Sequence, residues 1–120
     1  MIEISKIVFD ADALEADVEL SSGGISIVCY FHPVESQEEV IKAINNELLA
    51  FNTKNIMLDD FHTDIAVKTE EGYYSYFLRG TVIADTKIKV GDFVIDIGKI
   101  PGDIGIGATV SCECMRIDMQ

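Results

Sequence analysis

Two histidines and their acidic neighbours are the first residues to consider for catalysis. His62 lies near Asp59, Asp60 and Asp64, and a carboxylate beside an imidazole can orient the ring and raise its pKa for general base catalysis. The second histidine, His32, precedes a proline at the expected end of a strand. The sequence has no glycine loop of the P-loop type and no nucleophile-elbow or HExxH motif. We therefore predict no catalytic residue, and a ligand pocket near His62 stands as an alternative.

Three cysteines could supply metal ligands. Cys112 and Cys114 would share one face of a strand, and Cys29 lies three residues before His32, so four zinc ligands exist in principle. However, Cys29 and His32 fall on opposite faces of a regular strand, and the other two cysteines flank Glu113, which disfavours a thiolate. An odd number of cysteines is typical of reduced thiols. We interpret all three as free core thiols in the cytoplasm and predict no metal and no cofactor.

A stripe of carboxylates and a group of tyrosines suggest a contact surface instead. Residues 14–20 alternate strictly, which places Glu15, Asp17 and Glu19 together on one face of a half-buried strand. Tyr74 and Tyr76 share a face in the same way, and exposed tyrosines are favoured at protein interfaces. These five residues form our predicted partner-binding set. Cross-strand packing of the tyrosines and a purely solvated acidic face are the competing interpretations.

The charge of the chain limits the choice of partner. The 120 residues carry a net charge of −12, and residues 1–53, with ten acidic and two basic side chains, hold eight of those charges. A negative field disfavours proteins that bind nucleic acids through phosphates and proteins held on anionic membranes. The same field attracts basic proteins and accelerates their association. We therefore expect a basic protein partner, no nucleic acid and no membrane.

The predicted elements describe one domain, residues 1–120, of the α+β class with mainly β structure. Ser36-Gln37-Glu38-Glu39 resembles a capping box, and the apolar spacing that follows predicts one amphipathic helix at about 36–51. Alternating or apolar runs separated by short turns predict about seven or eight strands, with neighbours pairing antiparallel. Gly80 and a change of parity in residues 108–119 predict bulges or bends. These features favour a strongly curved antiparallel sheet or a small OB-like barrel.

Together these observations favour a small acidic intracellular protein-binding module. Its most concrete form is an inhibitor or immunity-type protein that masks a basic partner through Glu15, Asp17, Glu19, Tyr74 and Tyr76. The alternatives are a structural subunit of a homo-oligomeric assembly, joined through an exposed sheet edge, and a small-ligand binding protein or enzyme with its pocket near His62.

Overall fold

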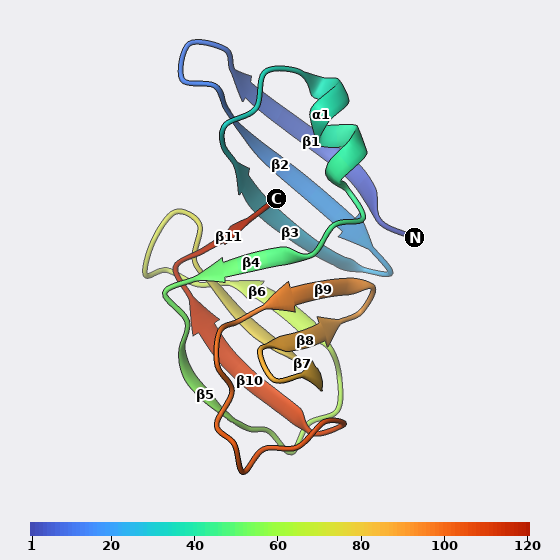
Figure 1. Ribbon diagram of the computed structural model, residues 1–120, viewed down its shortest axis with the longest axis vertical. Coiled ribbons are helices and arrows are strands. Elements are labelled where there is room, and N and C mark those ends of the chain that lie inside the picture. The colour runs from blue at the N-terminus through green and yellow to red at the C-terminus, as the bar shows by residue number, and fades with distance from the viewer.

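The structure is a computed structural model that describes residues 1–120, and it is dominated by β-strands. The chain forms eleven strands and one short helix, and its extents are 44 × 28 × 23 Å. Figure 1 shows these elements arranged along an elongated body. The elements are β1 (Glu3–Asp10), β2 (Glu15–Ser22), β3 (Ile25–Phe31), α1 (Gln37–Ala43), β4 (Leu48–Phe51), β5 (Lys54–Leu58), β6 (Ile65–Lys68), β7 (Tyr76–Ala84), β8 (Lys87–Val90), β9 (Phe93–Asp96), β10 (Thr109–Cys114) and β11 (Arg116–Asp118).

All strands belong to one mixed sheet that is not closed. The order is β1-β2-β3-β11-β4-β9-β8-β7-β10-β5, and β6 pairs with β7 beside this path. Most neighbours are antiparallel, but β11 runs parallel to β3 and β4 runs parallel to β9. The predicted mainly-β class is confirmed. The expected OB-like barrel of about seven or eight strands is not found, because the sheet has eleven strands and is open. The expected antiparallel pairing holds for most neighbours but not for these two parallel pairs.

The strand count differs because turns interrupt the predicted strands. Gly91 has a φ of 59°, and the resulting turn divides the expected strand at 88–97 into the hairpin of β8 and β9. Met115 separates β10 from β11 at the predicted change of parity. Gly80 lies within β7, and a Cβ there would stand 2.4 Å from the carbonyl oxygen of Lys89. Glycine at that position therefore lets the backbones of β7 and β8 approach each other closely.

The predicted helix at 36–51 is much shorter than its apolar spacing suggested. It ends at Ala43, where Asn46 N donates to Ala43 O over 3.0 Å, and the chain continues as β4. Leu48 and Ala50 are buried alternately with exposed neighbours, because β4 pairs with β11 and β9. Pairing with remote strands thus overrides the local helical pattern. No helix in the structure has the length and apolar character needed to cross a membrane.

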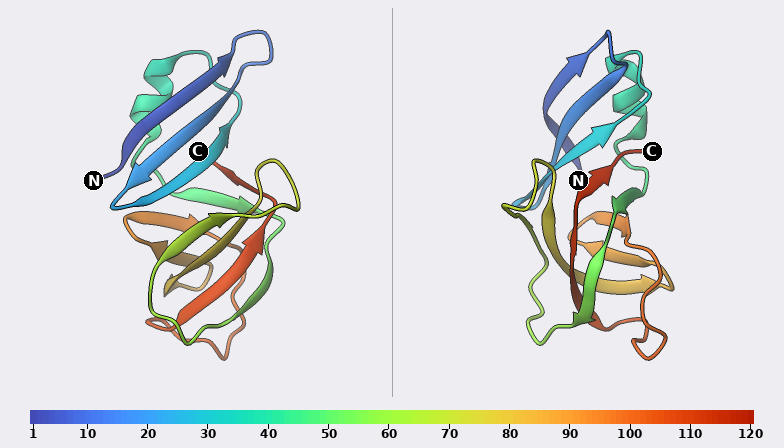
Figure 2. Two further views of the ribbon diagram at one scale, coloured as in Figure 1. Left: turned by 180° about the vertical axis from the view of Figure 1, so that it is seen from behind. Right: turned by 90° about the vertical axis from the view of Figure 1, so that its left-hand side faces the viewer.

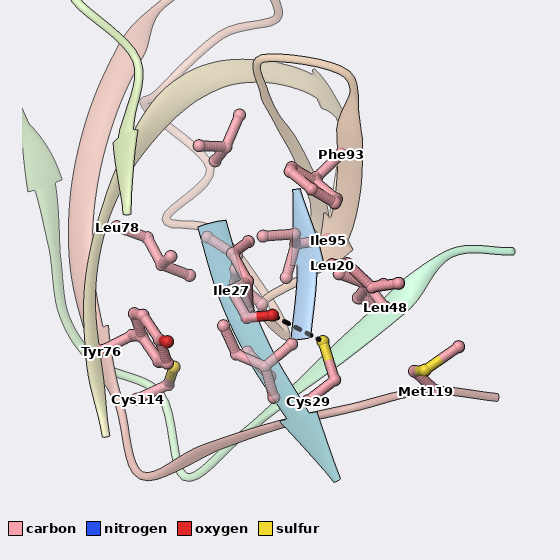
Figure 3. Packing of buried hydrophobic residues seen from close by; sticks show 14 of the residues in the cluster. Leu20, Ile27, Cys29, Leu48, Tyr76, Leu78, Phe93, Ile95, Cys114 and Met119 are labelled. Carbon is pink, nitrogen blue, oxygen red and sulfur yellow. Dashed lines mark hydrogen bonds between the residues drawn. The ribbon is translucent and has the colours of Figure 1, made fainter. Parts of the chain in front are cut away.

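The two faces of β1–β3 have different environments. Helix α1 covers one face, and the view from behind shows the opposite face without a covering element (Figures 1 and 2). Ala16, Val18 and Leu20 of β2 point into a cluster of 24 buried hydrophobic residues. Figure 3 shows Leu20 in this core with Tyr76 of β7, which comes from the other half of the chain. The uncovered face of β1–β3 is called the open face below.

Candidate functional site

The acidic stripe lies on the open face, as the alternation of β2 predicted. Glu15, Asp17 and Glu19 are half-buried and alternate with core residues of the same strand. Cross-strand register places Asp17 between Val8 of β1 and Tyr30 of β3. Asp17 is therefore framed by an apolar and an aromatic side chain, which partly exclude water and strengthen an ionic contact. Glu19 lies between Lys6 of β1 and Val28 of β3, and Glu15 lies opposite Asp10 of β1.

The loop between β6 and β7 brings tyrosines to this stripe. The buried Ser75 organises the loop, because its Oγ accepts from Gly72 N at 2.9 Å and lies 2.6 Å from the hydroxyl of Thr69. As a result, the Tyr74 hydroxyl donates to Asp17 Oδ1 over 2.6 Å, although the two residues are 57 positions apart. The Tyr73 ring packs edge-on against the Tyr74 ring, with centroids 4.7 Å apart.

A second phenol holds the next carboxylate. The Tyr30 hydroxyl donates to Glu15 Oε2 over 2.7 Å. This hydrogen bond raises the pKa of Tyr30. The pKa of Tyr74 is also raised, mainly by burial and to a smaller extent by the hydrogen bond to Asp17. Both phenols consequently remain protonated donors at neutral pH, and they fix the orientation of the two carboxylates without neutralising them.

A notch of about 130 Å³ opens between the stripe and the tyrosine loop. Its lining combines two carboxylates, an aromatic ring, an ammonium and two valines: Asp17, Glu19, Tyr73, Lys6, Val8 and Val28. Lys68 Nζ lies 4.6 Å from the centroid of the Tyr73 ring, so this ring already accepts a cation within the chain. Asp17 and Glu19 carry two negative charges and Lys6 carries one positive charge, so the lining has one net negative charge. The notch has the chemistry to accept a lysine or arginine side chain.

Tyr76 does not belong to this surface. It is only 4% exposed and packs in the core (Figure 3). Its hydroxyl accepts from Val28 N over 2.9 Å. The alternation that paired it with Tyr74 does not apply, because β7 begins at Tyr76 and Tyr74 lies in the preceding loop. The structure thus brings Tyr74 to the acidic stripe and places Tyr76 beneath it.

Sequence reasoning missed an arginine beside the open face. The guanidinium of Arg116 lies 4.5 Å from the centroid of the Tyr30 ring and 5.1 Å from that of Phe51. It also donates to both carboxylate oxygens of Asp118, at 2.6 and 3.0 Å, and this raises its pKa. The guanidinium therefore packs on the face of the Tyr30 ring. The spacing Arg-x-Asp, which puts both side chains on one face of a strand, was the available signal.

The surroundings of His62 do not form a pocket. Its Nδ1 lies 2.9 Å from Thr109 Oγ1, and His62 lines neither of the two hollows in the structure. Its acidic neighbours are engaged elsewhere, since Asp59 contacts Arg79 at 3.6 Å and Asp64 accepts from Gly91 N over 2.8 Å. The larger hollow, of about 600 Å³, lies between the turn after β7 and the loop at 99–106.

The three cysteines lie in the core as free thiols. Burial raises the pKa of Cys112 to about 12 and that of Cys114 to about 11, and it raises the pKa of Cys29 further still. Figure 3 shows Cys29 Sγ directed at Ile27 O, 3.9 Å away. No three histidine, cysteine, aspartate or glutamate side chains come together as ligands for one metal ion.

No family model, no curated protein and no solved structure matches this chain. The interpretation of its function therefore depends on the geometry of the open face.

Proposed function

We propose that this chain is a small cytoplasmic protein-binding module whose open face takes a basic side chain of a protein partner. The observation that carries this proposal is the notch, where Asp17 and Glu19 stand beside the exposed ring of Tyr73. The three free cysteines support a reducing compartment. The net charge of −12 supports a basic protein partner and disfavours nucleic acid.

The expected interaction energies favour one anchoring cation. A hydrogen bond from an ammonium or guanidinium to a partly desolvated carboxylate contributes about 1.5–3 kcal/mol. The Tyr73 ring already holds the Lys68 ammonium, so no second cation–π energy is counted for the partner. The hydrogen bond from Tyr74 keeps Asp17 in place before a partner arrives, so less side-chain entropy is lost on binding. Lys6 at the edge of the notch limits the site to a single additional cation.

The test removes the two charges of the notch and keeps its shape. In Asp17→Asn/Glu19→Gln, the amide oxygen that replaces the Asp17 carboxylate can still accept from Tyr74, so the loop keeps its anchor. The matched control, Glu38→Gln/Asp103→Asn, removes the same charge at exposed side chains in α1 and in the loop at 99–106, away from the open face. Wild type, variant and control are used as bait in extract of the source organism, and the captured protein is then purified and titrated against each.

We expect a basic protein that binds wild type and control with similar affinity and binds the variant at least tenfold more weakly. Its association with wild type should slow as salt is raised, because exposed charges are screened. Equal binding to all three proteins, or capture of no basic partner by folded wild type, would refute the proposal.

A further inference from the structure

Strand β1 is a long and uncovered edge of the sheet. It pairs with β2 on one side and has no strand on the other. Its register with β2 shifts between Ile4 and Lys6, so the regular part of the edge is the five residues 6–10. These residues contain no proline, and a regular edge of this kind can pair with another strand.

The other free edges are less suitable for pairing. Strand β5 contains Asn55 with a φ of 57°, and its register with β10 shifts as well. Strand β6 has only four residues. The regular part of β1 therefore offers the best template for an additional strand.

We propose that β1 pairs antiparallel with β1 of a second copy of this chain, about a two-fold axis through Val8. This register uses all five regular residues, and it sets Lys6 opposite Asp10 of the second copy, twice by symmetry. Val8 then meets its own copy, and Ile7 meets Phe9 of the second copy. The pairing is self-complementary in charge, as an isologous interface requires.

The exposure of the residues agrees with this pairing. Lys6, Val8 and Asp10 are exposed on the open face, with Val8 at 55%, whereas Ile7 and Phe9 are half-buried and pack at the margin of the core. A second β1 would cover the apolar side chains on both faces of the strand. The pairing extends the sheet without turning it over, so both copies of α1 lie on one face and both notches lie on the other.

The two charges are available to a second copy. Lys6 forms no ion pair within the chain. Asp10 uses Oδ1 to accept from Asp12 N and Ala13 N, at 3.1 and 3.2 Å, and its Oδ2 forms no hydrogen bond. Four residues along a strand span about 13 Å, so Lys6 and Asp10 of one chain cannot pair with each other. Within the chain Lys6 lies opposite Glu19 of β2 without forming an ion pair, and the second copy places Asp10 on its other side.

The test uses two charge-reversal variants, each of which should weaken dimerisation alone and which should dimerise with each other when mixed. Lys6→Asp makes the edge acidic and Asp10→Lys makes it basic, so each variant alone faces like charges across the axis. A mixture of the two variants restores both attractive pairs, as does the double variant Lys6→Asp/Asp10→Lys. The control is Lys99→Asp, which reverses an exposed charge in a loop remote from β1. Sedimentation equilibrium measures self-association of each protein, and circular dichroism verifies that each is folded.

We expect wild type and control to dimerise, each single variant to dimerise at least tenfold more weakly, and the equimolar mixture to recover most of the loss. The mixture also guards against misfolding, since an unfolded variant could not form the mixed dimer. Wild type that stays monomeric up to millimolar concentration would overturn the proposal. Dimers that persist in both single variants, or no recovery in the mixture and the double variant, would overturn it as well. None of these outcomes depends on the basic partner of the open face.

Discussion

The hydroxyl of Tyr76 connects two distant parts of the sheet. It accepts from Val28 N over 2.9 Å, and the two residues are 48 positions apart. Val28 lies in β3, which pairs with β2 on one side and with β11 only at Tyr30 on the other, so the Tyr76 hydroxyl takes the place of a strand on this second side. The change Tyr76→Phe removes the acceptor and keeps the ring, which leaves the core packing almost unchanged.

The expected cost of Tyr76→Phe follows from the burial of the bond. A buried donor without an acceptor costs about 1–3 kcal/mol of folding free energy, because it also loses its contact with water. The matched control is Tyr74→Phe, which removes the hydrogen bond to the half-buried Asp17 carboxylate. Water can reach that carboxylate after the change, so we expect a cost of about 1 kcal/mol or less.

Urea denaturation of the two variants and wild type measures this difference. We expect a lower midpoint for Tyr76→Phe with the same dependence of the unfolding free energy on urea, since the surface exposed on unfolding does not change. Native-state hydrogen exchange should also show faster exchange of the Val28 amide. If Tyr76→Phe costs no more than Tyr74→Phe, the Tyr76 hydroxyl does not support β3 and the reasoning fails.

Two further predictions concern a glycine and the thiols. Gly80→Ala should lower the unfolding free energy by about 1–3 kcal/mol, because the added Cβ would stand 2.4 Å from Lys89 O. The control Gly102→Ala, whose Cβ would have no atom within 4 Å, should change the unfolding free energy by less than about 0.5 kcal/mol. Equal effects of the two changes in urea denaturation would contradict this prediction. The free energy of unfolding should fall as pH rises from about 9 towards 12, because unfolded thiols ionise near 9.0 while Cys112 and Cys114 keep their protons until about 12 and 11. The contribution of the two thiols to the unfolding free energy is therefore complete below pH 9. In Cys112→Ala the unfolding free energy should fall less steeply as pH rises above 9. If it falls as steeply as in wild type, the Cys112 thiol does not contribute to the pH dependence.

The course of the chain around the helix shows a limit of sequence reasoning. Val40, Ile44 and Leu48 follow helical spacing, yet the helix ends at Ala43 and Leu48 begins a strand. Nothing in the local pattern distinguishes the two outcomes, because a spacing of four residues also fits a strand with alternate burial. The pairing of β4 with β9 and β11, whose residues lie more than 40 positions away, decides between them.

Sequence alternation likewise described only the part of the candidate site that lies on a single strand. The alternation of β2 placed Glu15, Asp17 and Glu19 on one face, and the structure agrees. Tyr74 reaches Asp17 through the loop that Ser75 organises, and no periodicity in the sequence describes such a loop. For the same reason the parity argument put Tyr76 with Tyr74, although it lies in the core.

Local pattern and composition were enough to establish the mainly-β class, the two faces of β2 and the excess of negative charge. These properties follow from alternation along the chain and from residue counts, which do not depend on distant residues. The order of the strands, the end of the helix, the meeting of Tyr74 with Asp17 and the uncovered edge at β1 became apparent only in the folded chain. Each of these depends on hydrogen bonds and packing between segments far apart in the sequence, and their free energy is gained only when the whole sheet forms.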